Sequence, residues 1–142
     1  MSGVGRRVLA VDPGEKRIGI AISDPSGTIA NPLMVIRHLS KMVDAAQIAE
    51  LARENDAAEI VVGQALDDDG NETPSARHAV KLAEAIRTQI ELPVSLWDES
   101  DSTNQAVAAK IALGVRRDKR KGHQDALAAA IILQSYLDAN SH

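Results

Sequence analysis

Hydrophobic residues in the chain fall into short runs that predict five β-strands. The first run is wholly apolar, as expected for a buried strand, and the second alternates between apolar and polar residues. The predicted strands are residues 8–11, 17–23, 28–37, 59–63 and 92–97. Pro32 interrupts the third run, and because proline donates no backbone hydrogen bond, we expect this strand at a sheet edge or with a bulge.

Two turn sequences separate the first three strands. Pro13-Gly14 has the residue order of a type II turn, and residues 24–27 (DPSG) fit a type I turn with proline second and glycine fourth. Short connections of this kind join antiparallel neighbours. The sequence therefore opens with a predicted three-stranded antiparallel meander.

Helical spacing of apolar residues predicts four helices in the remainder of the chain. The first runs from a Ser40 cap to about residue 55, with an inner face made of Val43, Ile48, Leu51 and Ala52. The second covers about residues 73–91, and the last about residues 122–139.

Capping residues mark the beginning of the second and third helices. Thr73 followed by Pro74 is a typical N-cap with a first-turn proline. Ser102 and Gln105 form a capping box for a helix that ends near Gly114. A meander followed by alternating helices and strands predicts one α/β domain over residues 1–142, with a five-stranded mixed sheet and helices on its faces.

Composition is that of an ordinary globular domain, with 142 residues, 44% of them hydrophobic and 25% charged. The absence of cysteine excludes disulfides and thiolate metal sites, and it suits a reducing compartment. No signal peptide or membrane-spanning run is recognisable, so we expect a cytoplasmic protein without a membrane partner. The shortage of aromatic residues argues against base stacking as a main mode of recognition.

Acidic residues stand at the ends of apolar runs, where buried charge is costly. Asp12 follows the first strand, Asp98 and Glu99 follow the fifth, and Asp125 opens the last helix. Converging carboxylates repel one another unless they are protonated or bind a divalent cation. Because ligands of open α/β sheets bind beyond the carboxyl ends of parallel strands, these residues are candidate ligands for one or two Mg²⁺ or Mn²⁺ ions. Such ions promote phosphodiester hydrolysis.

Basic residues gather just before the last helix, although the whole chain has a net charge of −4. The cluster is made of Arg116, Arg117, Lys119, Arg120 and Lys121. With Asp118 it carries a local charge of +4, which leaves −8 for the remainder of the chain. A compact basic patch on an acidic body can bind phosphates, or it can be a solvated loop. The histidines at positions 38, 78 and 142 have no partner at a recognisable spacing.

Several segments together resemble the YqgF/RuvX family, in the same order and over nearly the whole chain. The matching segments are residues 12–24 (DPGEKRIGIAISD), 60–63 (IVVG), 97–99 (WDE) with Ser102 and Thr103, 119–122 (KRKG) and 125–134 (DALAAAIILQ). Members of this family are RNase H-like proteins described as Holliday junction resolvases and as pre-16S rRNA processing nucleases. The resemblance implies an RNase H-like fold and a nuclease of the latter kind.

The resemblance also implies roles for individual residues. Asp12, Glu99 and Asp125 would be the metal-binding and catalytic acids, with Asp98 as an adjacent candidate. Lys16 and Arg17 would lie close to the scissile backbone, and the basic cluster would help to position the nucleic acid.

Two departures from the family pattern matter. Ser100 and Asp101 stand where the family has an arginine after the Asp-Glu pair, which removes a phosphate contact and adds a negative charge. Residues 63–65 (GQA) replace the family's Gly-Leu-Pro. The first departure keeps open a second hypothesis, in which the protein is a non-catalytic RNA-binding factor of ribosome assembly.

The substrate and the oligomeric state stay open at this point. Structured RNA and branched DNA differ in helix geometry and in the 2′-hydroxyl, and no residue can be tied to either. Symmetric cleavage of a four-way junction requires a dimer. Since no apolar stripe for an interface is recognisable, we expect a monomer or a weak homodimer. A nucleotide-binding fold of the actin or sugar-kinase type would need two such domains, and 142 residues supply one.

Overall fold

The computed structural model describes residues 6–67, 69–98 and 120–140, with the side chains of the last segment from Ala126 onward. The chain order is β1 (Arg7–Pro13), β2 (Arg17–Ser23), β3 (Ala30–Arg37), α1 (Lys41–Glu54), β4 (Ala57–Gln64), α2 (Pro74–Arg87), β5 (Val94–Asp98) and α4 (Arg120–Asn140). None of the helices in these segments is long and apolar enough to cross a membrane.

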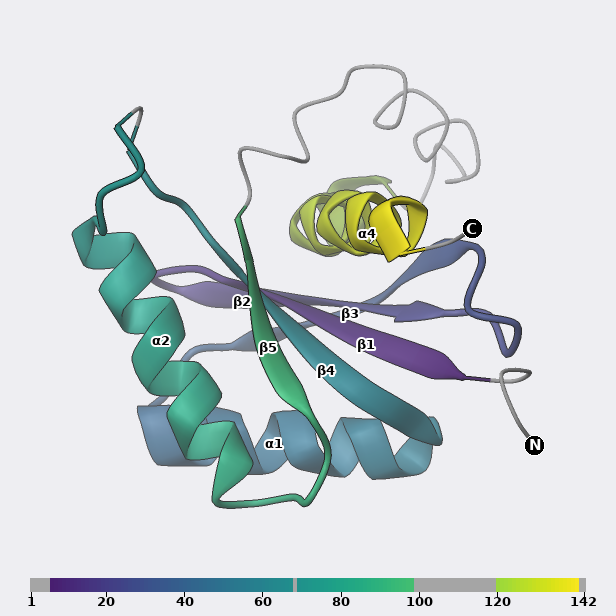
Figure 1. Ribbon diagram of the computed structural model, residues 1–142. Coiled ribbons are helices and arrows are strands. Elements are labelled where there is room, and N and C mark those ends of the chain that lie inside the picture. The colour runs from purple at the N-terminus through teal and green to yellow at the C-terminus, as the bar shows by residue number, and fades with distance from the viewer. Residues whose placement is uncertain (1–5, 68, 99–119, 141–142) are drawn as a thin grey trace.

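The strands form one sheet in the order β3-β2-β1-β4-β5. Strands β1, β2 and β3 pair antiparallel, whereas β4 pairs parallel with both β1 and β5. Helix α4 covers one face of the sheet, and α1 and α2 cover the other (Figure 1). The prediction of a five-stranded mixed sheet with helices on both faces is confirmed.

Strand β1 lies in the middle of the sheet and is buried on both faces. Leu9 and Val11 pack in the core beneath α1 and α2. Val8 and Ala10 pack in the second core, beneath α4. Because successive side chains of a strand point to opposite faces, this central strand divides its apolar residues between the two cores.

Strand β3 confirms what Pro32 predicted. It is an edge strand of the sheet, and its register with β2 shifts between Ile20 and Ala21, opposite Met34 and Pro32. A proline at this place costs no hydrogen bond of a central ladder.

The turn after β1 differs from the predicted type II turn. Strand β1 continues through Pro13, which pairs with Ile18, and Gly14 does not adopt the left-handed conformation that a type II turn requires. A Cβ atom at Gly14 would lie 2.3 Å from the carbonyl oxygen of Arg17. Glycine is needed here because the two backbones approach closely.

The turn at residues 24–27 is confirmed by a hydrogen bond of 2.9 Å from the Gly27 N–H to the Asp24 carbonyl oxygen. The Asp24 carboxylate accepts further hydrogen bonds from the backbone N–H groups of Ile29 and Thr28 and from the Ser26 hydroxyl. These bonds stabilise the charged carboxylate and lower the pKa of Asp24 from 3.8 to about 2, with the Ile29 bond making the largest contribution.

Two of the three predicted helix caps are confirmed, since Ser40 accepts from the Val43 N–H and Thr73 from the Ala76 N–H. The inner face of α1 was predicted partly wrongly, because Val43 is 42% exposed and the buried first-turn residue is Asp44.

Two helix ends also differ from the prediction. Helix α2 ends at Arg87, four residues before the expected end at 91, because Thr88 caps it by donating to the Ala85 carbonyl oxygen over 2.6 Å. Helix α4 begins at Arg120, so the last two basic residues of the predicted loop, Arg120 and Lys121, are helical. The helix predicted over residues 102–114 lies outside the described residues.

Helix α4 is held to the sheet by small residues and by polar contacts. Ala129 and Ala130 are fully buried in the second core, which lets the helix lie close to the strands. The Gln134 side chain accepts from the Ala30 N–H over 2.9 Å and donates to the Thr28 carbonyl oxygen over 3.0 Å. It thereby satisfies the backbone at the beginning of β3.

A further contact of α4 is made by Tyr136. Its hydroxyl donates to a carboxylate oxygen of Glu59 over 2.8 Å, and its ring lies edge-on to Trp97. Burial and, after it, the Glu59 carboxylate raise the pKa of Tyr136 to about 12. The helix is thus tied to β4 and β5 as well as to β3.

We predict that Gln134→Leu destabilises the protein. The change keeps an apolar contact but leaves the buried Ala30 N–H without its acceptor, which costs about 1–3 kcal/mol. Urea unfolding followed by circular dichroism measures the difference. Gln47→Leu, the same substitution at an exposed position of α1, is the control. An unchanged unfolding midpoint for Gln134→Leu would contradict this account of α4.

The Asp24 turn predicts a specific dependence of stability on pH. The folded pKa of about 2 is below the unfolded value of 3.8, so the stabilisation is complete above about pH 4 and is lost as the pH falls toward 2. Asp24→Asn is therefore expected to lower Tm at pH 7, and the gap to the wild type should narrow between pH 4 and pH 2. Glu84→Gln, on the exposed face of α2, is the control. A gap that stays constant with pH would rule out the carboxylate as the cause.

Candidate active site

Asp12 lies near the carboxyl end of the central strand, where burial ends. It is half-buried and pairs with Gly19 of β2. Since Ala10 and Val8 of β1 pack beneath α4, the alternation of the strand places Asp12 on the same face. This position agrees with the expectation that ligands gather beyond the carboxyl ends of the parallel strands.

Asp98 is the last residue of β5 and pairs with Gln64 of β4. Leu96 packs with the core beneath α1 and α2, whereas Trp97 packs with the core beneath α4. The alternation therefore places Asp98 on the α1 and α2 face, opposite to Asp12. Both carboxylates lie at the carboxyl ends of their strands, at the same edge of the sheet, but on opposite faces.

The other two expected acids lie at the limit of what the structure describes. Glu99 lies outside the described residues. Asp125 belongs to α4, four residues before Ala129 and eight before Leu133, which are both buried against the sheet. Within the described side chains, no three His, Asp or Glu residues gather as a metal site, and this set contains only two of the four acids.

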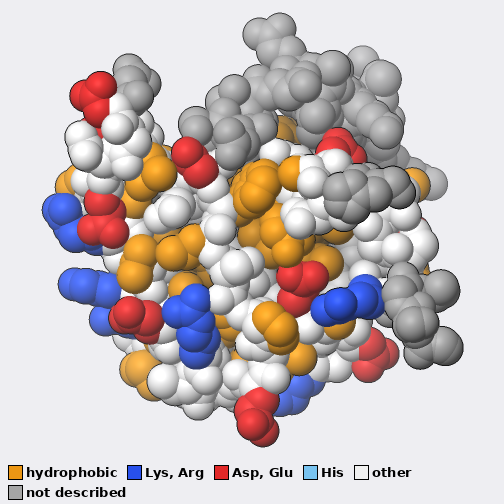
Figure 2. Space-filling model, viewed as in Figure 1, with side chains coloured by type: hydrophobic (Ala, Val, Ile, Leu, Met, Phe, Trp, Pro, Cys, Tyr) orange, Lys and Arg blue, Asp and Glu red, His pale blue; other side chains and the backbone are white. Residues whose placement is uncertain are grey.

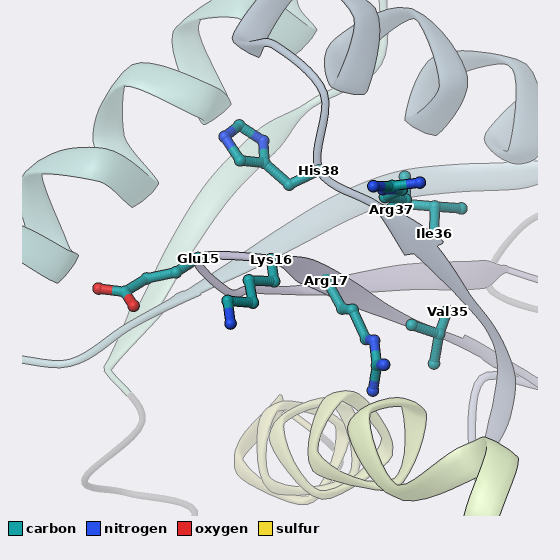
Figure 3. Close-up of a pocket in the computed structure, with 7 residues that line it drawn as sticks. All are labelled: Glu15, Lys16, Arg17, Val35, Ile36, Arg37 and His38. Atoms are coloured by element: carbon teal, nitrogen blue, oxygen red, sulfur yellow. The ribbon is translucent and has the colours of Figure 1, made fainter.

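The structure describes only some of the basic residues expected at the site. Lys16 lies in the turn between β1 and β2, and Arg17 begins β2, both exposed. Their side chains extend toward the α4 side of the sheet (Figure 3). Arg120 and Lys121 are in the first turn of α4. Arg116, Arg117 and Lys119 lie outside the described residues.

A histidine–aspartate contact was missed by the sequence interpretation. The Nδ1 atom of His38 contacts the carboxylate of Asp44, which is only 1% exposed and also accepts from the Leu39 N–H over 3.0 Å. The His78 ring lies edge-on to His38 at 5.7 Å. The expectation that these histidines have no partner is therefore wrong. A polar residue at a core position of the first helical turn was the available signal.

These histidines line a cavity of about 360 Å³ beside the β1–β2 turn. Pro13, Gly14 and Glu15 form one wall, and the beginning of α2 forms another. A neighbouring cavity of about 650 Å³ contains the basic residues of the turn and the end of β3 (Figure 3). Elsewhere on the face shown in Figure 2, acidic and basic side chains lie interspersed. Two adjacent cavities of the described chain thus lie at the turn that follows Asp12.

Solved structures with the same fold are Holliday junction resolvases. A Thermus thermophilus RuvC bound to a Holliday junction superimposes with a TM-score of 0.64 at 20% identity, over 95% of this chain and 96% of that one. A Fowlpox virus resolvase in complex with junction DNA gives a TM-score of 0.58 at 12% identity, over 94% and 97% of the two chains. The chain therefore shares the fold of these two proteins.

Sequence comparison identifies the family more closely. A family model described as "RuvX: Holliday junction resolvase" matches residues 6–139. A protein of Caldanaerobacter subterraneus subsp. tengcongensis named "Putative pre-16S rRNA nuclease" is 40% identical over 96% of this chain and 99% of its own. A Syntrophus aciditrophicus protein of the same name is 41% identical over 95% and 90% of the two chains. The chain belongs to the RuvX family, whose members are phosphodiester hydrolases.

Proposed function

We propose that the protein is a divalent-metal-dependent nuclease that hydrolyses phosphodiester bonds during maturation of the 5′ end of pre-16S rRNA. The observation that carries the proposal is the placement of Asp12, half-buried at the carboxyl end of β1 and on the same face as Arg17. A carboxylate beside an arginine at this edge supplies a cation ligand and a phosphate contact at adjacent positions. Relatives that are similar over nearly the whole chain are named as pre-16S rRNA nucleases, which supports the proposal.

Asp12, Glu99 and Asp125 would hold one or two Mg²⁺ or Mn²⁺ ions. Asp98 lies on the face opposite to Asp12, which argues against Asp98 as a ligand of the same ion. The position of Asp125 in α4 supports its inclusion, since it stands four and eight residues before Ala129 and Leu133, which pack against the sheet. Carboxylate oxygens are the ligands that these hard cations prefer.

The bound cation would supply Lewis-acid stabilisation of the charge that develops on the reacting phosphoryl group. The remaining work is done by side chains of the chain itself. Arg17 and Lys16 neutralise the phosphodiester and hold it over the carboxylate end of β1. The basic residues 116–121 add contacts to the backbone away from the reacting bond.

Recognition of the substrate would depend on phosphates and on shape. The chain has one tryptophan and one tyrosine, and both pack against each other beneath α4. They are therefore committed to the fold and offer no platform for stacking bases. This favours structured RNA bound through its backbone.

The alternative is a family member that binds RNA without cleaving it. Ser100 and Asp101 favour this alternative, because they replace a phosphate-binding arginine by a neutral and a negatively charged residue. A second alternative is cleavage of branched DNA, which the resolvase fold favours. Paired cuts at a junction require two copies of the chain.

We predict that Asp12→Asn abolishes Mg²⁺-dependent cleavage while nucleic-acid binding persists. The amide keeps the volume but loses the charge that attracts the cation, so kcat should fall by about 100-fold or more. Cleavage is followed on labelled RNA with Mg²⁺ or Mn²⁺, and binding is followed in EDTA. Asp56→Asn, in the exposed turn after α1, is the control. Wild-type protein that binds but does not cleave with either ion would favour the non-catalytic alternative.

The choice of substrate is tested by comparing two labelled nucleic acids. We expect cleavage of a fragment spanning the 5′ leader of pre-16S rRNA, and little cleavage of a four-way DNA junction of similar length. Sedimentation of the protein with and without each substrate shows whether one or two copies act. Symmetric paired cuts in the junction by a dimer would contradict the RNA proposal and support the resolvase.

A further inference from the structure

The larger cavity beside the β1–β2 turn is the strongest candidate for a further role. It has a volume of about 650 Å³ and is lined on one side by the turn and on the other by the end of the edge strand β3. Its charged lining consists of Lys16, Arg17, Arg37 and Glu15, with His38 at its border. The lining thus carries three permanent positive charges and one negative charge. Figure 3 shows the Glu15 side chain directed away from Arg17.

Arg17 and Arg37 are directly opposite each other in the antiparallel ladder of β2 and β3. Cross-strand neighbours lie on one face with their Cβ atoms about 5 Å apart, and like charges in such a pair destabilise a sheet. Figure 3 shows the two guanidinium groups apart from each other, so each can contact a different phosphate, and a bound nucleic-acid backbone would relieve the like-charge pair.

Neither arginine is used to hold the fold together. Among contacts between described residues, the side chains of Lys16, Arg17 and Arg37 form no hydrogen bond or ion pair. Other arginines of the chain differ, since Arg53 donates to the Gln89 carbonyl oxygen and Arg87 to the Val94 carbonyl oxygen, each over 2.6 Å. The pair at the cavity leaves its donors available to a ligand.

The arginine pair lies close to the proposed catalytic carboxylate. Asp12 pairs with Gly19, and Arg17 is two residues further along β2 on the same face. Two residues of a strand span about 7 Å, and Arg37 lies about 5 Å beyond Arg17 on the next strand. Arg17 is therefore the arginine nearer to Asp12, and Arg37 is the outer one.

We infer that Arg37 binds the backbone phosphate next to the one that is cleaved, which Lys16 and Arg17 hold. The inference rests on the proposed function and adds a residue to it. Two guanidinium forks on neighbouring strands can each donate two parallel hydrogen bonds to phosphate oxygens. Arg37 is a positioning residue, because it holds the strand at one nucleotide's distance from the reacting bond.

The experiment compares Arg37→Gln with Lys81→Gln, which removes an exposed cation from α2. Binding of a labelled single-stranded RNA and of a four-way DNA junction is measured in EDTA at several salt concentrations. Arg37→Gln should weaken binding roughly tenfold, as expected for one lost charge-assisted hydrogen bond. It should also reduce the slope of log Kd against log salt by about 0.7–0.9, the value for one phosphate. Lys81→Gln should match the wild type.

Two further measurements separate this role from a structural one. Because the substitution relieves a like-charge pair, Tm of free Arg37→Gln at low salt should equal or exceed that of the wild type. In the cleavage assay KM should rise with a smaller change in kcat, and Arg37→Lys should restore the salt slope.

The outcomes of this experiment distinguish a failure of the Arg37 subsite from a failure of the proposed nuclease function. Wild-type binding that depends on salt, together with an unchanged slope and Kd for Arg37→Gln, would overturn the subsite and leave the nuclease proposal standing. A lower Tm with normal binding would assign Arg37 to the fold instead. Wild-type protein that binds neither probe would overturn both proposals.

Discussion

The burial of β1 on both faces is the constraint on which the rest of the structure depends. A strand in the middle of a sheet must supply apolar side chains to two cores, so its residues alternate between the helices on either side. In this chain Leu9 and Val11 serve one core, and Val8 and Ala10 serve the other. Asp12 is the next residue in that alternation. Its position at the edge of the core beneath α4 follows from the packing of the four residues before it.

The pairing of neighbouring strands then determines what lies beside Asp12. The hairpin places Gly19 opposite Asp12, with Arg17 two residues before Gly19 on the same face of β2. The edge strand β3 places Arg37 opposite Arg17. Close approach at Gly14 keeps this hairpin tight. A carboxylate and two guanidinium groups thus come from three strands that are consecutive in the sequence, and the pairing of successive strands assembles this half of the candidate site.

The helix that covers this face of the sheet depends on longer-range contacts. Helix α4 lies on the sheet because small residues allow close packing, and Gln134 and Tyr136 bond to the edge strand and to β4. These polar contacts join residues more than seventy positions apart in the chain. They hold in place the helix that contains Asp125, and so couple the folding of the C-terminal segment to the proposed site.

Three errors of the sequence interpretation share one cause. Caps at Ser40 and Thr73 and the edge character of β3 were predicted correctly, because each depends on chemistry within a few residues. The conformation of Gly14, the exposure of Val43 and the contact of His38 with Asp44 were not, because each depends on which other segment lies nearby. Helix periodicity alone cannot tell a helical face that meets the sheet from one that meets solvent at the end of the helix.

By itself the sequence determined the order and type of the elements, the mixed sheet and the acidic residues at the ends of apolar runs, since hydrophobic period and local hydrogen bonding depend only on neighbouring residues. Only the tertiary structure decided that Asp98 lies on the opposite face from Asp12 and that Arg37 stands across from Arg17. Both facts are consequences of strand register, which arises when separate segments pair and which no single segment encodes.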